Sequence, residues 1–155
     1  MLRSRHLDVL ASNQLARRLT AAFEPGVNVA RFAFLNPIVP DLTPDWVTFT
    51  RLVAETLRAS LERHREDARF RALVGELAAR SDDFNRAWAG PRPEPPGTGQ
   101  FGWEHPVVGR LALAYQELRA RGGEDGEVLV LWRPVDGVSA ERLERLRTGG
   151  DPVPG

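Results

Sequence analysis

The chain has 155 residues, of which 42% are hydrophobic and 27% charged, a composition typical of a globular protein that can bury one core. All of its 21 basic residues are arginines, they balance 21 acidic residues, and there is no cysteine. These facts exclude lysine Schiff bases, disulfides, thiolate nucleophiles and cysteine metal sites. There is no basic surface that indicates DNA binding by charge alone. The sequence shows no signal peptide and no apolar run of membrane-spanning length, so we expect a cytoplasmic protein without a membrane partner.

The N-terminal third predicts one strand and two short helices. The apolar run Leu7–Ser12 contains the β-branched Val9 and is typical of a strand. Asn13 is a good N-cap for a helix over Gln14–Phe23, in which large apolar residues recur every four positions. The run Asn28–Leu35 is too short to assign by its period; we interpret it as a short helix, with a strand as the second choice.

Three helices are expected in the middle of the chain. Thr43 as cap and Pro44 as first residue start the first, which continues with apolar residues three and four apart to about His64. A second helix begins near Asp67. Ser81 caps a third, which carries Phe84 and Trp88, two aromatic residues that share one helix face.

Strands follow this helical part. The stretch Gly90–Gly102 is rich in proline and glycine, and we expect an irregular connection or a weak hairpin arm. The segment Val107–Leu118 alternates between apolar and smaller or polar residues, as a half-exposed strand does. Arg121–Gly126 is a turn, so the next strand, Val128–Trp132, should pair antiparallel to it.

The segment Val128–Trp132 is apolar at successive positions, which predicts a central strand covered on both faces. Ser139 is the expected cap of a last helix with Leu143 and Leu146 facing inward. Helices followed by a cluster of antiparallel strands predict an α+β domain over residues 1–148, with a disordered tail over 149–155.

Motifs of enzymes are weak in this sequence. Gly97–Gly102 matches the spacing G-x-G-x-x-G, but prolines precede it and no helix start follows, so we interpret it as a flexible turn. The histidines His6, His64 and His105 have no metal-binding spacing, and no serine lies in a nucleophile elbow. We therefore predict no catalytic residue, no metal site, no cofactor and no enzymatic activity.

Aromatic residues are the strongest remaining signal. Trp46, Phe49, Phe70, Phe84 and Trp88 lie on expected helix faces. Most of them must belong to the core. The alternative is that some of them surround an apolar cavity between helices and sheet, a common place for a small ligand.

Several stretches, in this order and spacing, resemble the ligand-binding domain of MmyB-like transcription regulators, a group within the helix-turn-helix regulators of the xenobiotic-response-element type. The resemblance covers roughly Leu7 to Leu146. The matching residues are Leu7–Asn13, Asn28–Pro37, Asp45-Trp46, Leu73–Leu77, Ser81 with Phe84 and Trp88, His105–Gly109, Leu113 with Tyr115 and Leu118, and Val128–Trp132.

The resemblance implies a PAS-like α+β domain that holds a small apolar ligand, such as a fatty acid, between helices and an antiparallel sheet. In the family an N-terminal helix-turn-helix domain precedes it and binds DNA. Met1 falls almost at the start of the sensor domain, so we expect no direct DNA binding by this chain, whether it is a truncated gene, a mis-called start or a stand-alone sensor. A second departure is Ala89–Pro93, which replaces the His and basic residues that usually follow the tryptophan.

The main hypothesis is a ligand-binding regulatory domain. A buried carboxylate head group would need a positive or hydrogen-bonding partner, and Arg31, Arg86 and His105 are the candidates. Phe84 and Trp88 would close the helical side of the pocket. The residues expected to hold an apolar chain are Phe32, Leu35, Trp46, Phe49, Leu113, Tyr115 and Leu131.

Two alternatives stay open. A ligand-free interaction module could form a homodimer through an exposed face of the sheet, with Leu129 or Trp132 at the contact. A small enzyme would need clustered histidines and carboxylates, which the sequence does not indicate.

Overall fold

A computed structural model of the protein describes residues 1–37, 45–90, 97–119 and 126–149. Their strands form a five-stranded sheet in the order β2-β1-β5-β4-β3, with every neighbouring pair antiparallel. The strands are β1 (Leu2–Arg3), β2 (Val9–Ala11), β3 (Thr98–His105), β4 (Gly109–Arg119) and β5 (Val128–Pro134). The helices are α1 (Gln14–Leu19), the 3-10 helix η1 (Ala21–Phe23), α2 (Val29–Leu35), α4 (Trp46–Arg63), α5 (Ala68–Arg80), α6 (Asp82–Ala89) and α7 (Gly137–Thr148).

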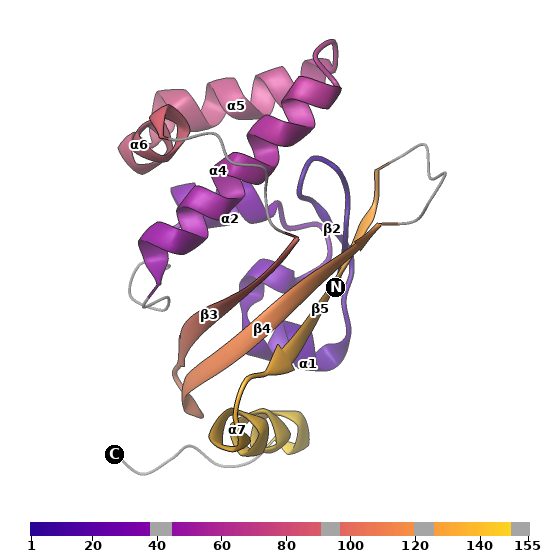
Figure 1. The fold of residues 1–155 in the computed structure, drawn as a ribbon, viewed down its shortest axis with the longest axis vertical. Helices are drawn as coiled ribbons and strands as arrows, with labels where there is room; N and C mark the ends of the chain where they lie inside the picture. Colours follow the sequence, from indigo (N-terminus) through magenta and orange to yellow (C-terminus); the bar gives the residue numbers. More distant parts are fainter. Residues whose placement is uncertain (38–44, 91–96, 120–125, 150–155) are drawn as a thin grey trace.

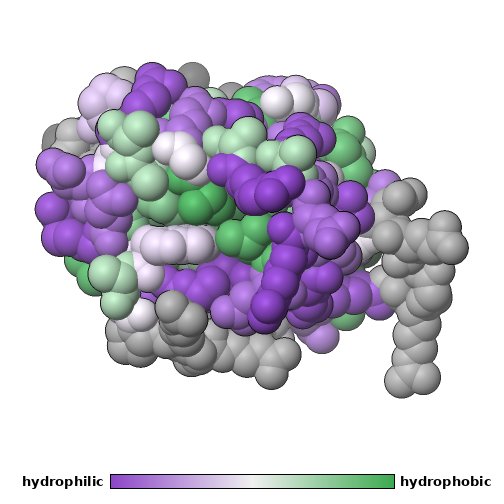
Figure 2. All heavy atoms as spheres, turned by 90° about the horizontal axis from the view of Figure 1, so that it is seen from above, coloured by the Kyte–Doolittle hydropathy of each residue, from purple (hydrophilic) through white to green (hydrophobic). Residues whose placement is uncertain are grey.

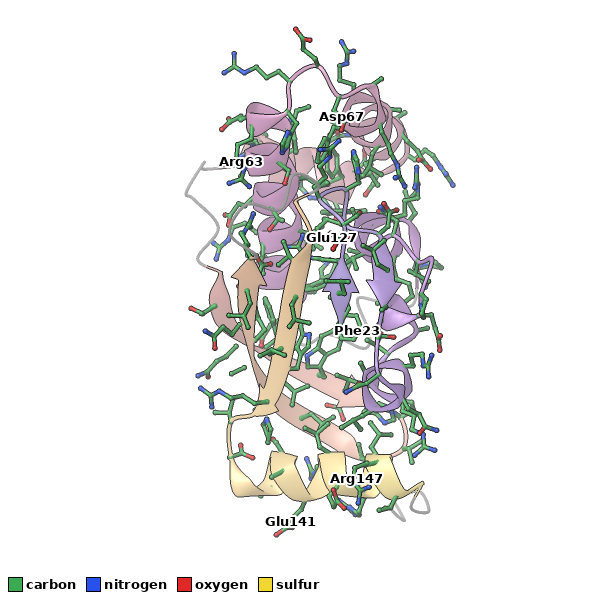
Figure 3. The ribbon with its side chains drawn as sticks, turned by 90° about the vertical axis from the view of Figure 1, so that its right-hand side faces the viewer. Phe23, Arg63, Asp67, Glu127, Glu141 and Arg147 are labelled. Atoms are coloured by element: carbon green, nitrogen blue, oxygen red, sulfur yellow. The ribbon has the colours of Figure 1, made fainter. Side chains whose placement is uncertain are left out.

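The helices form two groups around the sheet. Helices α4, α5 and α6 gather at one end of the molecule, and α7 lies across the other end (Figure 1). Arg63 and Asp67 mark the first end, while Glu141 and Arg147 of α7 mark the second (Figure 3). The expected α+β class with an antiparallel sheet is confirmed.

Most helices begin where the sequence predicts. The side chains of Asn13, Asn28, Asp67 and Ser81 each accept a hydrogen bond from a backbone N–H in the first turn of the helix that follows. Such caps satisfy N–H groups that have no partner inside the helix. The residues between Asn28 and Asn36 form a helix, so the strand alternative for this stretch is wrong.

Two predicted helices differ in their bounds. The helix expected over Gln14–Phe23 divides at Thr20, which has an extended backbone and caps η1 with its hydroxyl. Thr43 and Pro44, the expected start of the long helix, lie outside the described residues. The described part begins after Asp45, whose carboxylate accepts a hydrogen bond from the N–H of Gly102 at 2.8 Å instead of capping α4.

The glycine-rich stretch is a strand, so the expectation of a flexible turn is wrong and the alternative of a hairpin arm is confirmed from Thr98 onward. Residues from Thr98 onward pair with β4 along the whole of β3. Gly99 lies directly against Tyr115, and a Cβ atom at this position would come within 2.6 Å of the tyrosine ring. The glycine is therefore required by the packing of Tyr115 across the strand pair, and no nucleotide-binding loop is formed.

Strand β5 is central, as expected, but one of its faces is not covered. Val128 and Val130 are buried, whereas Leu129 and Leu131 are 39% and 48% exposed. The expectation of burial on both faces is therefore wrong. The alternation predicted for the preceding strand is confirmed, because β4 buries Tyr115 and the other large residues on the same side. We call the buried side the inner face of the sheet and the other side its outer face.

Helix α7 begins differently from the prediction. Its cap is Asp136, whose carboxylate accepts a hydrogen bond from the N–H of Ser139. The Ser139 hydroxyl instead accepts from the N–H of Ala112 at 2.9 Å and so joins α7 to β4. Leu146 is buried and Leu143 half-buried, as predicted. Of the expected tail, residues 150–155 lie outside the described residues.

The helical end is hydrophilic on its surface and closely packed inside. Seen from above, hydrophilic residues dominate its rim, and hydrophobic ones show mainly between them (Figure 2). Beneath this surface Phe70, Leu77 and Phe84 are fully buried.

Candidate functional site

Two neighbouring cavities lie against the inner face of the sheet. The first has a volume of about 60 Å³ and the second about 140 Å³. Met1, Val130 and Trp132 line both cavities and therefore separate them. The other residues around the first cavity are Arg3, Leu7, Phe23, Val29, Phe49, Leu52, Val53, Thr56, Phe101, Tyr115 and Glu117. Those around the second are Asn13, Leu15, Ala16, Leu19, Leu113, Leu131 and Leu143.

Aromatic rings form most of the wall of the first cavity. The ring of Phe101 stacks on that of Tyr115 with centroids 5.6 Å apart and meets Phe49 of α4 edge-on at 5.8 Å. Tyr115 lies 5.4 Å from Trp132 in the next strand. Phe23 of η1, labelled in Figure 3, contacts Trp132 at 5.7 Å. The alternation of strands brings Phe101, Tyr115 and Trp132 to one face, because residues two apart point the same way. Phe49 and Phe23 cover this face from α4 and η1. We call these five residues the sheet cluster.

One end of the first cavity is charged. Arg3 is only 5% exposed, and its guanidinium donates a hydrogen bond of 2.5 Å to Oε1 of Glu117. Oε2 of Glu117 accepts a second hydrogen bond, at 3.2 Å, from Arg119. The sheet register explains this grouping: Arg3 and Arg119 both pair with Val128, and Glu117 pairs with the adjacent inward-facing residue of β5.

Burial affects both ionisable groups beside this charged end. Burial, together with the negative charges of Glu117 and Glu55, raises the pKa of Tyr115 to about 12. The hydroxyl of Tyr115 therefore stays protonated at neutral pH and can donate a hydrogen bond. Burial lowers the pKa of Arg3 from its ordinary value, against the effect of Glu117. The guanidinium remains charged because its ordinary pKa lies far above neutral pH.

Buried polar atoms without partners lie close to this site. Among the described residues, the indole N–H of Trp132 and that of Trp103 have no hydrogen-bond acceptor, and the two rings meet at 5.9 Å. Oε1 of the buried Glu55 also makes no hydrogen bond, although Arg51 lies 3.7 Å away. Such atoms are uncommon in native proteins because each costs free energy unless something pairs with it.

The structure brings some of the sequence-predicted ligand residues together and places others elsewhere. Phe49 and Tyr115 line the first cavity, and Leu113 and Leu131 line the second. The other eight residues, which line neither of these two cavities, are Phe32, Leu35, Trp46, Phe84, Trp88, Arg31, Arg86 and His105.

Phe84 and Trp88 belong to a second aromatic group, at the helical end. Their rings stack at 5.2 Å, as their spacing of four predicts, and Phe34 meets Phe84 edge-on at 5.1 Å. The guanidinium of Arg58 lies over the Trp88 ring and donates a hydrogen bond to the Trp88 carbonyl. We call these three aromatic residues the helix cluster, together with Phe70, which is buried at the same end and contacts His6 and His64. Phe32, Leu35 and Trp46 are half-buried and pack against the core.

The three expected head-group partners have other contacts. Arg31 donates to Glu76 at 2.8 Å, and Arg86 pairs with Asp83 one helical turn away on the surface. One ring nitrogen of His105 lies 2.9 Å from the carbonyl of Arg18. Its other ring nitrogen accepts hydrogen bonds from two backbone N–H groups in the turn before β4, which indicates a structural role for this histidine.

Sequence reasoning missed Arg3, Glu117 and Phe101 as candidate site residues. Nothing around Arg3 distinguishes it from the surface arginines of the chain, because β1 has only two residues and no detectable period. The alternation that placed Tyr115 inward also places Glu117 inward. A carboxylate on the apolar face of a strand was therefore the signal that could have pointed to a buried cation.

Neither a metal centre nor a membrane segment is found in the part of the chain that the structure describes. There, no three His, Asp or Glu residues are grouped closely enough to hold a metal ion. No described helix has the length and apolar character needed to cross a bilayer.

Residues 1–146 match the family model of the MmyB-like transcription regulator ligand binding domain. The chain belongs to this family. The match spans nearly the whole sequence and agrees with the resemblance drawn from the residues. A comparison with curated proteins gave no match. The family is the ligand-binding part of a regulator and is not catalytic, so this MmyB-like domain is not an enzyme.

Proposed function

We propose that this MmyB-like ligand-binding domain binds an apolar small molecule of the fatty-acid type on the inner face of its sheet. The observation that carries the proposal is the pair of adjoining cavities with apolar and aromatic walls. Ligand pockets combine such walls with a few polar groups that fix orientation, and Arg3, Glu117 and Tyr115 are groups of that kind here.

A chain of more than a few carbon atoms would need both cavities. Each is smaller than the roughly 300–1,000 Å³ that is usual for ligand pockets. Met1 and Trp132 stand between them, and methionine adapts readily because its side chain is unbranched and flexible. We expect these two side chains to move apart when the ligand enters, which makes one continuous apolar channel along β5.

Ligand binding of this kind can control a regulator. A ligand that fits only the opened arrangement shifts the population toward it, by as much as its affinities for the two arrangements differ. In a transcription regulator such a shift would change how a DNA-binding domain binds its target DNA. The sensing role falls to this domain, and we propose no direct contact between it and DNA.

The proposal can be tested on purified protein. Organic extraction followed by mass spectrometry should release a co-purified fatty acid or a related lipid. Protein stripped of lipid should gain thermal stability with saturated fatty acids, because a ligand at 100 times its Kd adds about 2.7 kcal/mol to the free energy of unfolding. A clean extract together with an unchanged melting temperature across chain lengths of roughly 8 to 16 carbons would contradict the proposal.

A homodimer is the second proposal, and it rests on the outer face of the sheet. Leu118 and Leu129 are cross-strand partners there, and each is about two-fifths exposed. With Leu131, which is 48% exposed although it also borders the second cavity, they form an apolar patch that a second copy of the chain could cover. Trp132, the other residue expected at such a contact, instead lines both cavities on the inner face. Sedimentation equilibrium should show a dimer that Leu129→Glu dissociates; a monomeric wild type would contradict this.

A further inference from the structure

The charged end of the first cavity joins two guanidinium groups to one carboxylate. Glu117 is a single carboxylate held by two guanidinium groups, Arg3 at 2.5 Å and Arg119 at 3.2 Å. The buried carboxylate of Glu55, whose negative charge also acts on Tyr115, offsets the second arginine. Arg3 is nearly fully buried, whereas Arg119 has an exposed fraction of 48%. Of the two arginines, Arg3 is therefore the one that borders the cavity.

Arg3 has hydrogen-bonding capacity that the described residues do not use. A guanidinium has several N–H donors arranged to grip a carboxylate through two parallel bonds. Among the described residues its hydrogen bonding is limited to the one bond to Glu117. Tyr115, in the same wall of the cavity, has a hydroxyl that makes no hydrogen bond to the described residues. These donors are not among the fully enclosed atoms without a partner, so they border accessible space, where an acceptor on a ligand can pair with them.

Glu117 has a second partner that can hold it in place. If Arg3 turned toward an anion in the cavity, Oε2 of Glu117 would keep its bond to the Arg119 side chain on the same strand. The exchange therefore leaves no carboxylate buried without a partner, which is the costly outcome in ion pairs of this kind.

From these contacts we propose that Arg3, assisted by the Tyr115 hydroxyl, binds the singly charged carboxylate head of an aliphatic ligand, and that Glu117 is the internal anion with which this head group competes. This inference rests on the proposed function, since it assigns the head-group end of the same pocket. The apolar chain then runs from Arg3 past Trp132 toward the second cavity. Glu117 binds Arg3 when the pocket is empty. When the pocket is filled, Glu117 binds Arg119 alone.

The test compares two ligands that share a chain and differ at the head. Dodecanoate and 1-dodecanol, both below their aggregation limits, are titrated against lipid-free protein while tryptophan emission is followed. Wild type should bind dodecanoate about 10- to 100-fold more tightly than the alcohol, the range expected for a charge-assisted hydrogen bond. Arg3→Met should remove this preference and leave the affinity for 1-dodecanol unchanged.

Two further variants keep the result decisive. Glu117→Gln removes the competing charge and should tighten dodecanoate binding several-fold, whereas a purely structural ion pair would make this variant bind more weakly. Arg133→Met is the matched control, since Arg133 is an exposed arginine on the outer face of the same sheet, and it should bind both ligands as wild type does.

The outcomes separate the two proposals. Failure of wild type to bind either ligand overturns the proposed function and this inference with it. Equal binding of both ligands by wild type and by Arg3→Met overturns the inference alone. If Arg3→Met does not fold, Glu117→Gln decides: tighter dodecanoate binding supports the exchange, and weaker or unchanged binding overturns it.

Discussion

The helix cluster and the sheet cluster use the same kinds of residue and pack in different ways. In the helix cluster Phe70 and Phe84 are completely buried, and neither lines either of the two cavities. In the sheet cluster Phe101 and Tyr115 stack on each other and still border empty space. Helix side chains can interlock along their ridges, whereas flat rings from twisted strands leave gaps when a helix covers them. Aromatic content alone therefore does not identify the pocket. The pocket is identified by whether the rings lie on helices or on strands.

The largest expected difference between the clusters is in stability. Phe84→Ala should lower the free energy of unfolding by about 4 kcal/mol, because it leaves a cavity in a fully packed region. Phe101→Ala should cost less, about 2 kcal/mol, because its ring already borders a cavity and so loses fewer contacts. Urea denaturation of both variants measures the difference. Equal costs would show that the two clusters are equally packed.

Adding one methylene group should have opposite effects at a packed site and at a cavity site. Val9 is almost fully buried and lines neither cavity, so Val9→Ile should overpack the core and cost about 1–3 kcal/mol. Val53 borders the first cavity, so Val53→Ile should raise the free energy of unfolding by about 0.5–1 kcal/mol. Val53→Ile should also weaken ligand binding by occupying the same space. If both Val9→Ile and Val53→Ile lower the free energy of unfolding, the cavity has no room for an added methylene group.

The helical end should also show a dependence on pH. Burial raises the pKa of Asp67, but hydrogen bonds from His6 and from the N–H groups of Arg69 and Phe70 outweigh it and lower the value to about 2, from an ordinary 3.8. A lowered pKa gives stability that is present above about pH 4 and is lost as the pH falls toward 2. Asp67→Asn should lower the free energy of unfolding by on the order of 1 kcal/mol at pH 6. It should also remove the loss of stability at low pH that this carboxylate causes. Urea denaturation at pH 6, 4 and 3 compares it with wild type; parallel curves would contradict the assignment.

The smallest effects are expected on the outer face of the sheet. Leu129→Thr should change the free energy of unfolding by no more than about 0.5 kcal/mol, since the side chain is 39% exposed. Val130→Thr makes a similar polar change at the neighbouring position. It should lower the free energy of unfolding by about 1–3 kcal/mol, because it buries a hydroxyl in an apolar wall. Thermal denaturation of both variants checks the difference. Similar losses would mean that the outer face is covered in solution, as the proposed homodimer requires.

Local signals in the sequence were sufficient for most helices. Caps such as Asn13 and Ser81 act within one turn, so their effect can be recognised from neighbouring residues. Strand β3 was open only as a weak hairpin arm, because glycine has a low strand propensity and its extended form comes from pairing with β4. Short strands such as β1 have no period at all.

The candidate site was only partly predictable for the same reason. The spacing of Phe84 and Trp88 correctly predicted that they share a face, but not whether that face meets a cavity or the core. Arg3 is buried because β1 lies between β2 and β5, an arrangement that depends on residues more than a hundred positions apart. Contacts over such separations leave no pattern in one local stretch of sequence.

The central claim is that ligand enters the cavity at the sheet cluster and not the helix cluster. Methyl NMR tests it most directly. Lipid-free protein with labelled Met, Leu and Val methyl groups is titrated with dodecanoate. The account predicts shifts and ligand contacts for the methyl groups of Met1, Val53 and Val130, with Leu73 and Leu77 of α5 unchanged. Ligand contacts to Leu73 and Leu77, with Val53 and Val130 unaffected, would contradict it.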